Sequence, residues 1–147
     1  MMMRNPDDTT RRRASTWMLT ACGIWLVALG AYFIILRPAL LPEDPRFMGT
    51  TLAQLHDAAP GLEHWLRIVF TVMGGYMVGA GALTLFLARA VMPLRLAGTA
   101  WVLAIAGLST VVLMSAMNFV LHSDFRRVLV PPALLWLAGL AAYVLRG

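Results

Sequence analysis

Four long apolar stretches alternate with polar segments along this chain of 147 residues. They cover residues 16–36, 65–88, 96–120 and 128–145. Each holds close to the roughly 20 residues that a helix needs to cross the hydrocarbon layer of a bilayer. The pattern predicts an all-α membrane protein, an up-and-down bundle of four transmembrane helices that forms one domain over residues 16–147.

The polar segments predict how these helices are connected. Residues 1–15 carry acids and arginines with few apolar residues, so we expect a disordered cytoplasmic N-terminus. Residues 37–64 hold four prolines and four acids and form a long outer loop between the first two helices. Within this loop, Thr50 or Thr51 is expected to cap a short helix that ends before Pro60.

Composition supports a lipid environment. The chain is 60% hydrophobic and only 13% charged, whereas a soluble domain has about 25% charged residues. All twelve of its Lys and Arg residues are arginines, and they lie mainly near the predicted helix ends, so the high pI does not indicate a nucleic-acid partner. The single cysteine, Cys22, lies inside the first apolar stretch, where it cannot form an intramolecular disulfide and is expected to be buried.

The arginines also predict the orientation in the membrane. Basic residues gather on the cytoplasmic side of membrane proteins. With the N-terminus inside, that side holds seven arginines and the outer side five, and a run of three arginines precedes the first helix. We therefore expect both termini in the cytoplasm. The inner set is Arg4, Arg11, Arg12, Arg13, Arg89, Arg95 and Arg146, and the outer set is Arg37, Arg46, Arg67, Arg126 and Arg127.

Small residues predict how the helices pack, because close approach drives helix association in lipid. The second helix offers Gly74, Gly75 and Gly79 on one face, and the third offers small residues at heptad spacing. We expect these two helices to make the closest contact, near the cytoplasmic half. The alternative is that Gly75 and Gly79 form a homodimer face. The small residues of the third helix are Ala100, Ala104 and Gly107.

No Asp, Glu, Lys or His lies in the core of any apolar stretch. Proton- or ion-coupled transport uses ionisable groups near the midplane, so a small multidrug exporter, which depends on a glutamate in its first helix, is disfavoured. Membrane enzymes acting on glutathione or eicosanoids need several converging buried polar groups, and these are also missing. The sequence identifies no catalytic residue.

Histidines offer the one candidate for metal chemistry. His56, His64 and His122 all fall on the predicted outer side, with acids nearby in the sequence. Imidazole and carboxylate together suit zinc, copper or iron. The spacing is not diagnostic, and histidines at membrane interfaces usually have no ligand. We therefore assign no metal and no cofactor.

The most distinctive string is Leu41–Gly49, LPEDPRFMG. Glu43 or Asp44 could pair with an arginine and hold the loop across the mouth of the bundle. The candidate partners are Arg46, Arg126 and Arg127. The other interpretation is a solvated turn, and the sequence does not separate the two.

Together with the glycine-rich string VFTVMGGY at 69–76, this segment resembles small four-helix bacterial inner-membrane proteins that are loosely DoxX-like. The resemblance covers length, helix arrangement and the glycine-rich second helix. It implies a location in the bacterial inner membrane and an association with redox complexes, and it transfers no residue role.

Two functional hypotheses follow. The first is a non-catalytic membrane subunit or scaffold that associates with itself or with a larger membrane complex. The second is a protein that binds a small lipophilic ligand, a quinone or a lipid, between the second, third and fourth helices. The candidate pocket residues are Tyr76, Met114, Asn118 and Trp136.

Overall fold

The computed structural model describes the backbone of residues 6–145 and the side chains of residues 13–145. This part of the chain is helical and contains no strand. Three helical segments are long and apolar enough to cross a membrane, Arg13–Ile35, Leu62–Leu94 and Thr99–Val120. They coincide with the first three predicted stretches and support a multi-pass membrane protein.

The first of these segments belongs to helix α1, Pro6–Ile35. The helix begins inside the N-terminal segment that was expected to be disordered, of which residues 1–5 lie outside the described part. Proline is compatible with the first turn of a helix because its missing N–H has no intrahelical partner there. Extending an existing helix avoids the cost of nucleation, which explains how a polar segment becomes helical.

The second and third segments each contain a π-helical turn. Helix α4, Leu62–Phe86, continues as the π-helix η1, Leu87–Val91, and the 3₁₀ turn η2, Met92–Leu94. After the turn, α5, Thr99–Gly107, continues through the π-helix η3, Leu108–Val112, into α6, Leu113–Val120. π-Helical turns widen a helix locally and are frequent at functional sites.

The last helix, α7, Val130–Val144, is shorter than the predicted stretch 128–145. Its 15 residues span roughly 22 Å at 1.5 Å per residue. Two prolines lie in its first turn, Pro131 and Pro132, where missing N–H donors cost little. It is apolar but shorter than the three segments that are long enough to cross a membrane.

Helices α1 and α4 form the most extensive helix pair, and glycines bring their backbones together. A Cβ atom on Gly74 would lie 2.7 Å from the carbonyl oxygen of Gly30, and one on Gly81 would lie 2.8 Å from that of Gly23. The paired glycines are seven residues apart on both helices, so they fall on one face of each. The prediction that the second and third hydrophobic helices make the closest contact is wrong, because Gly74 faces α1.

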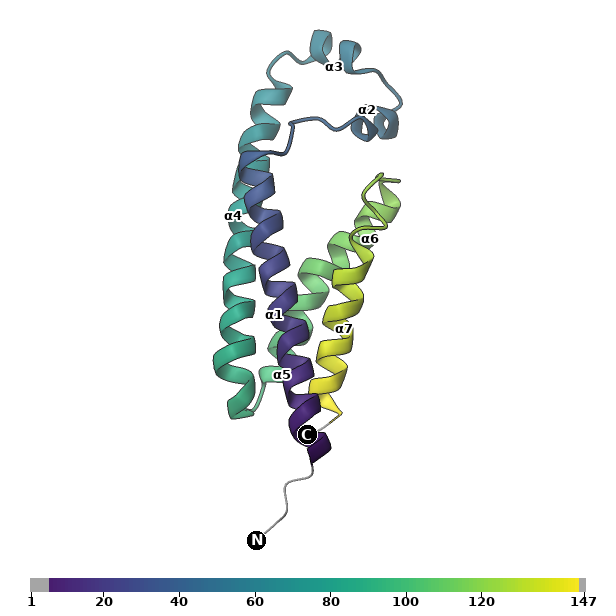
Figure 1. Cartoon of the computed structure of the whole chain (residues 1–147). Coiled ribbons are helices and arrows are strands. Elements are labelled where there is room, and N and C mark those ends of the chain that lie inside the picture. Colours follow the sequence, from purple (N-terminus) through teal and green to yellow (C-terminus); the bar gives the residue numbers. More distant parts are fainter. Residues whose placement is uncertain (1–5, 146–147) are drawn as a thin grey trace.

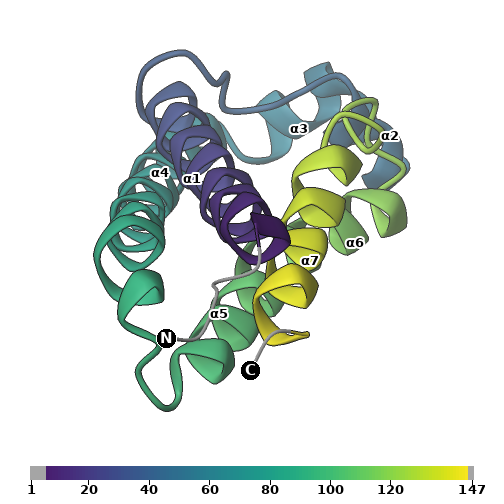
Figure 2. The ribbon, with the colours of Figure 1, turned by 60° about the horizontal axis from the view of Figure 1, so that its bottom comes forward.

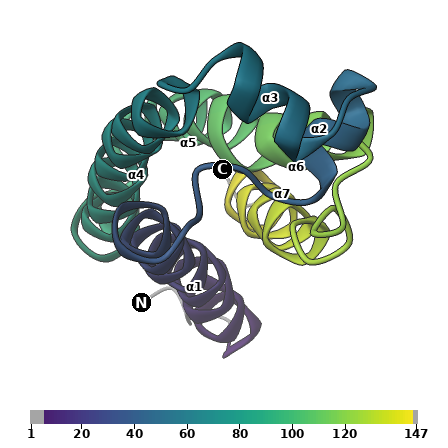
Figure 3. The same cartoon turned by 90° about the horizontal axis from the view of Figure 1, so that it is seen from above.

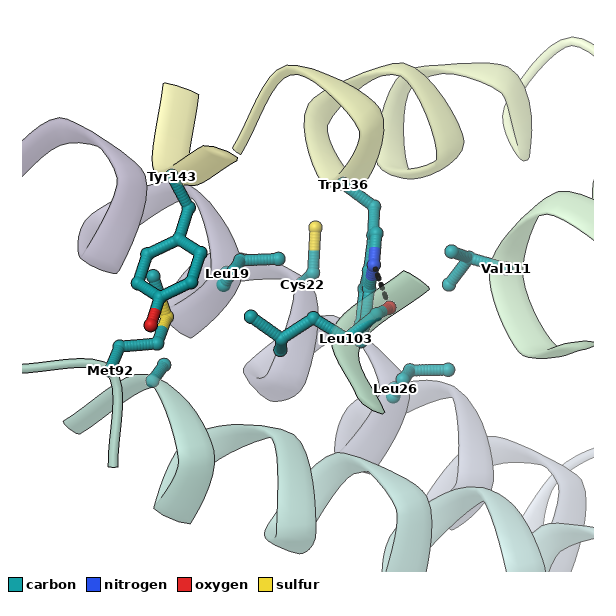
Figure 4. Packing of buried hydrophobic residues seen from close by; sticks show 9 residues of the cluster. Leu19, Cys22, Leu26, Met92, Leu103, Val111, Trp136 and Tyr143 are labelled. Atoms are coloured by element: carbon teal, nitrogen blue, oxygen red, sulfur yellow. Dashed lines mark hydrogen bonds between the residues drawn. The ribbon is translucent and has the colours of Figure 1, made fainter. Parts of the chain in front are cut away.

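Helix α7 packs on the other side of α1, so α1 lies between α4 and α7 (Figure 2). The buried core forms here, where Leu19, Cys22 and Leu26 of α1 meet Trp136 of α7 and Leu103 of α5 (Figure 4). Cys22 is 1% exposed, which confirms the prediction that it is buried. Its thiol donates a hydrogen bond to the carbonyl of Pro132 at 3.5 Å.

Two short helices, α2, Glu43–Met48, and α3, Leu52–Ala58, interrupt the connection between α1 and α4. Thr51 caps α3 and forms a capping box with Gln54. Thr51 is one of the two residues that the sequence predicts as the cap of a short helix in this loop. The pair α1 and α4 diverges from α6 and α7 toward this end of the molecule (Figure 1). Seen from above, the segment that leads from α1 to α2 crosses the space between these two arms (Figure 3).

A candidate lipophilic-ligand cavity

A cavity of about 510 Å³ lies between the two diverging arms. Its walls come from α1, α4, η3 and α6. Residues at the start of α2 line one end of the cavity, which we call its outer end. The wall is mainly apolar, with Leu, Met and Phe side chains. Pockets of this size and character hold small molecules in many proteins.

Three of the four predicted pocket residues line this cavity. Tyr76 contributes from α4, and Met114 and Asn118 contribute from α6. Trp136 is not among the lining residues. It is 1% exposed in the core, and its indole N–H donates a hydrogen bond to the carbonyl of Leu103 at 3.0 Å.

The position of Trp136 depends on Gly107. A Cβ atom on Gly107 would collide with the indole ring, and its nearest atom would be the indole nitrogen. Gly107, which was predicted as a helix-packing residue, therefore leaves room for a ring that fills the core rather than the cavity.

The cavity is open on the side between α4 and α6. Several lining side chains on these helices are themselves exposed, among them Tyr76, Leu113 and Met117, with Tyr76 at 76%. These exposed apolar side chains are compatible with contact to lipid acyl chains. A lipophilic molecule could therefore enter from the bilayer.

Hydroxyl groups interrupt the apolar wall near the middle of the span Thr99–Val120, and an amide group does so near its end. Ser109 and Thr110 lie in the π-helix η3 and donate to the carbonyls of Ile105 and Ala106 at 2.7 and 2.6 Å. Asn118 donates to the carbonyl of Met114 at 2.9 Å. Each hydroxyl uses its one donor within the helix, whereas Asn118 uses one of its two amide N–H donors there. The oxygens of all three side chains can accept hydrogen bonds from a ligand.

Arg37 lies at the outer end of the cavity, just beyond α1. Its guanidinium carbon lies 3.5 Å from the ring centroid of Phe70 and 5.1 Å from that of Phe33. One of its N–H groups donates to the carbonyl of Pro38 at 2.9 Å. Burial lowers the pKa of Arg37 below its ordinary value, and the negative charge of Asp44 opposes that shift. The group remains a cation at neutral pH.

Glu43 lines the same end of the cavity and is only 3% exposed. Its carboxylate accepts a hydrogen bond from the hydroxyl of Ser123 at 3.1 Å. That hydroxyl in turn accepts from the backbone N–H of Phe125 at 3.1 Å. No residue in the described part donates to the second oxygen of Glu43.

An exposed ion pair joins the same two segments, between Arg46 and Asp124 at 2.9 Å. Between residues 13 and 145 no ion pair joins Glu43 or Asp44 to any arginine. Of the two interpretations left open by the sequence, the ion pairs do not form, yet the loop is not merely solvated, because Glu43 and Arg46 fix α2 to the turn before α7. The Asp44 carboxylate instead accepts a hydrogen bond from the backbone N–H of Leu41 at 2.8 Å, which stabilises the turn before α2. Sequence reasoning missed Arg37 and Ser123, because only the fold brings them to the cavity.

The histidines do not form a metal site. In the part of the chain that the structure describes, no three His, Cys, Asp or Glu residues come close enough to hold a metal ion. His122 adopts a left-handed conformation with φ of 55° in the turn after α6. His56 and His64 lie in α3 and at the start of α4.

The remaining predicted packing residues occupy different environments. Gly75 and Gly79 are exposed, and a Cβ atom on either would meet nothing within 4 Å. Ala100 packs against the core, whereas Ala104 is half-buried. The glycine pair thus faces away from the rest of the chain.

Two arginines of the predicted inner side lie at the end of the molecule opposite α2, and each makes a hydrogen bond there. Arg89, in η1, donates to the hydroxyl of Thr20 at 3.1 Å and lies over the ring of Trp17. Arg95 donates to the carbonyl of Tyr143 at 3.0 Å and lies over its ring. The predicted inner arginines Arg4 and Arg146 lie outside the described residues, and so do the side chains of Arg11 and Arg12. Arg89 and Arg95 thus lie at the end of the molecule opposite α2, whereas the end near α2 carries both signs of charge, with Arg37 and Arg46 beside Glu43, Asp44 and Asp124.

No protein-family model matches this chain, and neither a curated protein nor a solved structure is significantly similar to it. The roles assigned to its residues therefore rest on geometry and chemistry.

Proposed function

We propose that this protein binds a small lipophilic molecule, a lipid or a quinone, inside the membrane. The cavity between α1, α4 and α6 carries this proposal. It combines an apolar wall, hydrogen-bonding groups at mid-depth and at the outer end, and an opening toward the acyl chains. The π-helix that contributes Ser109 and Thr110 to the wall supports the same conclusion.

In this proposal α7 is the fourth membrane crossing of a four-helix bundle. Its apolar sequence and its packing on α1 support a crossing, and the flanking apolar residues Val128, Leu129 and Leu145 add length. A short hydrophobic span is accommodated by local thinning of the bilayer at modest cost. The arginine distribution supports cytoplasmic termini, and the resemblance to DoxX-like proteins favours the bacterial inner membrane.

Filling the cavity tests the function. The full chain is purified in mild detergent, irradiated with a photoreactive quinone analogue and separately with a photoreactive lipid, and the labelled peptides are identified. We expect labels on peptides from α4 and α6. Ala80→Trp should abolish this labelling because Ala80 lines the cavity. Met114→Trp, from the opposite wall, should act in the same way if Ala80→Trp lowers stability.

The matched control is Ala82→Trp, which places the same side chain on an exposed position of α4 outside the cavity. It should retain the labelling of the unmodified chain. If neither probe labels α4 or α6, or if both filling variants label as strongly as the control, the proposed function is wrong.

A second candidate function is that of a membrane subunit or scaffold, and the exposed pair Gly75 and Gly79 favours it. Small residues four positions apart allow two helices to approach closely in lipid. This pair has no intrachain partner among the described residues. Native mass spectrometry of the protein from its own membranes tests this function: masses of assemblies that Gly79→Leu dissociates would support it, and a chain that stays monomeric would exclude it.

A further inference from the structure

The outer end of the cavity carries charge of both signs. Arg37 supplies a cation, and Glu43 and Asp44 supply carboxylates beside the same apolar space. Arg37 pairs with no carboxylate at ion-pair distance in the described part of the chain. Its guanidinium stacks on Phe70 instead, which leaves in-plane N–H donors for a ligand.

Glu43 restricts the chemistry of that ligand. A buried carboxylate is costly unless hydrogen bonds or a cation compensate for the lost water. Glu43 is 3% exposed, and the Ser123 hydroxyl satisfies one of its oxygens. The other oxygen lacks a donor from the described chain, so a ligand that brings a donor or a positive charge to this point is favoured.

Most lipophilic headgroups satisfy only part of this arrangement. A purely anionic headgroup can bind Arg37 but is repelled by Glu43 and Asp44. A neutral quinone can accept from Arg37 but leaves the Glu43 carboxylate without a cation. A zwitterionic headgroup with a phosphate and a primary ammonium matches both signs of charge, and its ammonium can donate hydrogen bonds.

The shape of the cavity suits a molecule that remains partly in the bilayer. The opening between α4 and α6, lined by exposed Tyr76 and Met117, lets acyl chains extend out of the protein. The segment that leads from α1 to α2 crosses the space between the two arms (Figure 3), and its residues Arg37 and Leu41 line the outer end of the cavity. A headgroup at this level would lie under that segment while its chains follow the walls of α4 and α6.

We propose that the ligand is a phospholipid with a zwitterionic, primary-amine headgroup of the phosphatidylethanolamine type, whose phosphate binds Arg37 and whose ammonium binds Glu43. This inference rests on the proposed function, since it places the headgroup in the same cavity. The ligand class is therefore membrane phospholipid, whose acyl chains would contact the apolar wall.

Native mass spectrometry of the full chain in detergent tests the proposal. Phosphatidylethanolamine and phosphatidylglycerol with identical acyl chains are titrated separately, and the bound fraction is measured for each. We expect roughly tenfold tighter binding of phosphatidylethanolamine, the scale on which one charge-assisted hydrogen bond acts. Glu43→Gln should remove this preference, and Arg37→Gln should weaken both lipids because both carry a phosphate.

Matched controls exist on the same side of the molecule. Glu63→Gln and Arg67→Gln change the same charges at exposed positions outside the cavity and should leave binding unchanged. Equal binding of both lipids, abolished by Ala80→Trp but unaffected by Glu43→Gln, would overturn the headgroup inference and leave the cavity function standing. Binding that Ala80→Trp leaves intact would overturn the proposed function itself.

Discussion

Glu43 and Ser123 are 80 positions apart in the chain, yet the hydroxyl of Ser123 donates a hydrogen bond to the Glu43 carboxylate at 3.1 Å. Both residues are almost fully buried, at 3% and 2% exposed. The bond fixes the start of α2 to the turn that precedes α7. Glu43, Ser123 and the segment before α2 all line the outer end of the cavity, so this contact holds that part of the cavity wall in place.

Removal of the Ser123 hydroxyl should therefore loosen α2. Ser123→Ala leaves a buried carboxylate without its donor, which costs about 1–3 kcal/mol. We expect a lower unfolding temperature in detergent and faster backbone hydrogen exchange over residues 43–48. Mass spectrometry of deuterium uptake measures the second effect.

The control for Ser123→Ala is Asp124→Asn, which breaks the neighbouring ion pair between Arg46 and Asp124. An exposed pair contributes only about 0–1 kcal/mol. Exchange over the same residues should change little. Equal exchange in both variants would show that the buried hydrogen bond does not hold α2.

The contact between α1 and α4 predicts opposite effects for two adjacent glycines. Gly74→Ala would place a Cβ atom 2.7 Å from the carbonyl oxygen of Gly30, a backbone atom that cannot move alone. We expect a loss of about 1–3 kcal/mol in the free energy of unfolding. Gly75→Ala meets open space and should be neutral or stabilising, because alanine favours a helix over glycine by about 1 kcal/mol. Unfolding in a detergent series measures both.

These glycines also show what hydropathy and spacing can predict. The three longer spans follow from the count of apolar residues, because the bilayer sets that number. The small-residue spacing of α4 identifies a packing face but carries no information about its partner. Gly74 therefore meets Gly30 of α1, while Gly75 and Gly79 face outward.

Gly107 should be intolerant of any side chain. Gly107→Ala would displace the Trp136 ring and break its hydrogen bond to Leu103. We expect a loss of about 1–3 kcal/mol from overpacking and a change in near-ultraviolet circular dichroism. In a Trp136→Leu background the same alanine should cost much less, and a double-mutant cycle measures that coupling. Additive effects would contradict the proposed collision.

The candidate site was only partly predictable for a similar reason. Tyr76, Met114 and Asn118 lie within the apolar stretches that hydropathy predicts to be helices, and all three line one cavity. Trp136 could not be separated from them by sequence, because the space left by Gly107 decides where its ring lies. Arg37 and Ser123 lie in connections, where no periodicity indicates a partner.

Arg37 should make no contribution to the pH dependence of stability near neutrality. Burial lowers its pKa in the folded state below the ordinary value of an arginine. The unfolded chain therefore binds more protons only between the lowered pKa and the ordinary arginine pKa, and stability rises with pH only within that strongly alkaline window. Below it the group is charged in both states. The pH profiles of unfolding for the unmodified chain and Arg37→Gln should be parallel from pH 5 to 9, and diverging profiles would contradict this.

Cysteine labelling in intact cells tests the four crossings. The native Cys22 is 1% exposed, so the unmodified chain should give little background. Cysteines are introduced singly at Gln54 in α3, at Leu94 at the end of η2 and at Leu145 after α7. All three positions are exposed, so each should react where the reagent has access.

A membrane-impermeant maleimide should label Gln54→Cys in intact cells, and label Leu94→Cys and Leu145→Cys only after permeabilisation. This pattern requires α7 to cross the membrane, because Leu94 and Leu145 must then lie on the same side. Labelling of Leu145→Cys together with Gln54→Cys would mean that α7, at 15 residues, stays on the outer side. Labelling of only Leu94→Cys and Leu145→Cys would keep four crossings and reverse the orientation that the arginines predict.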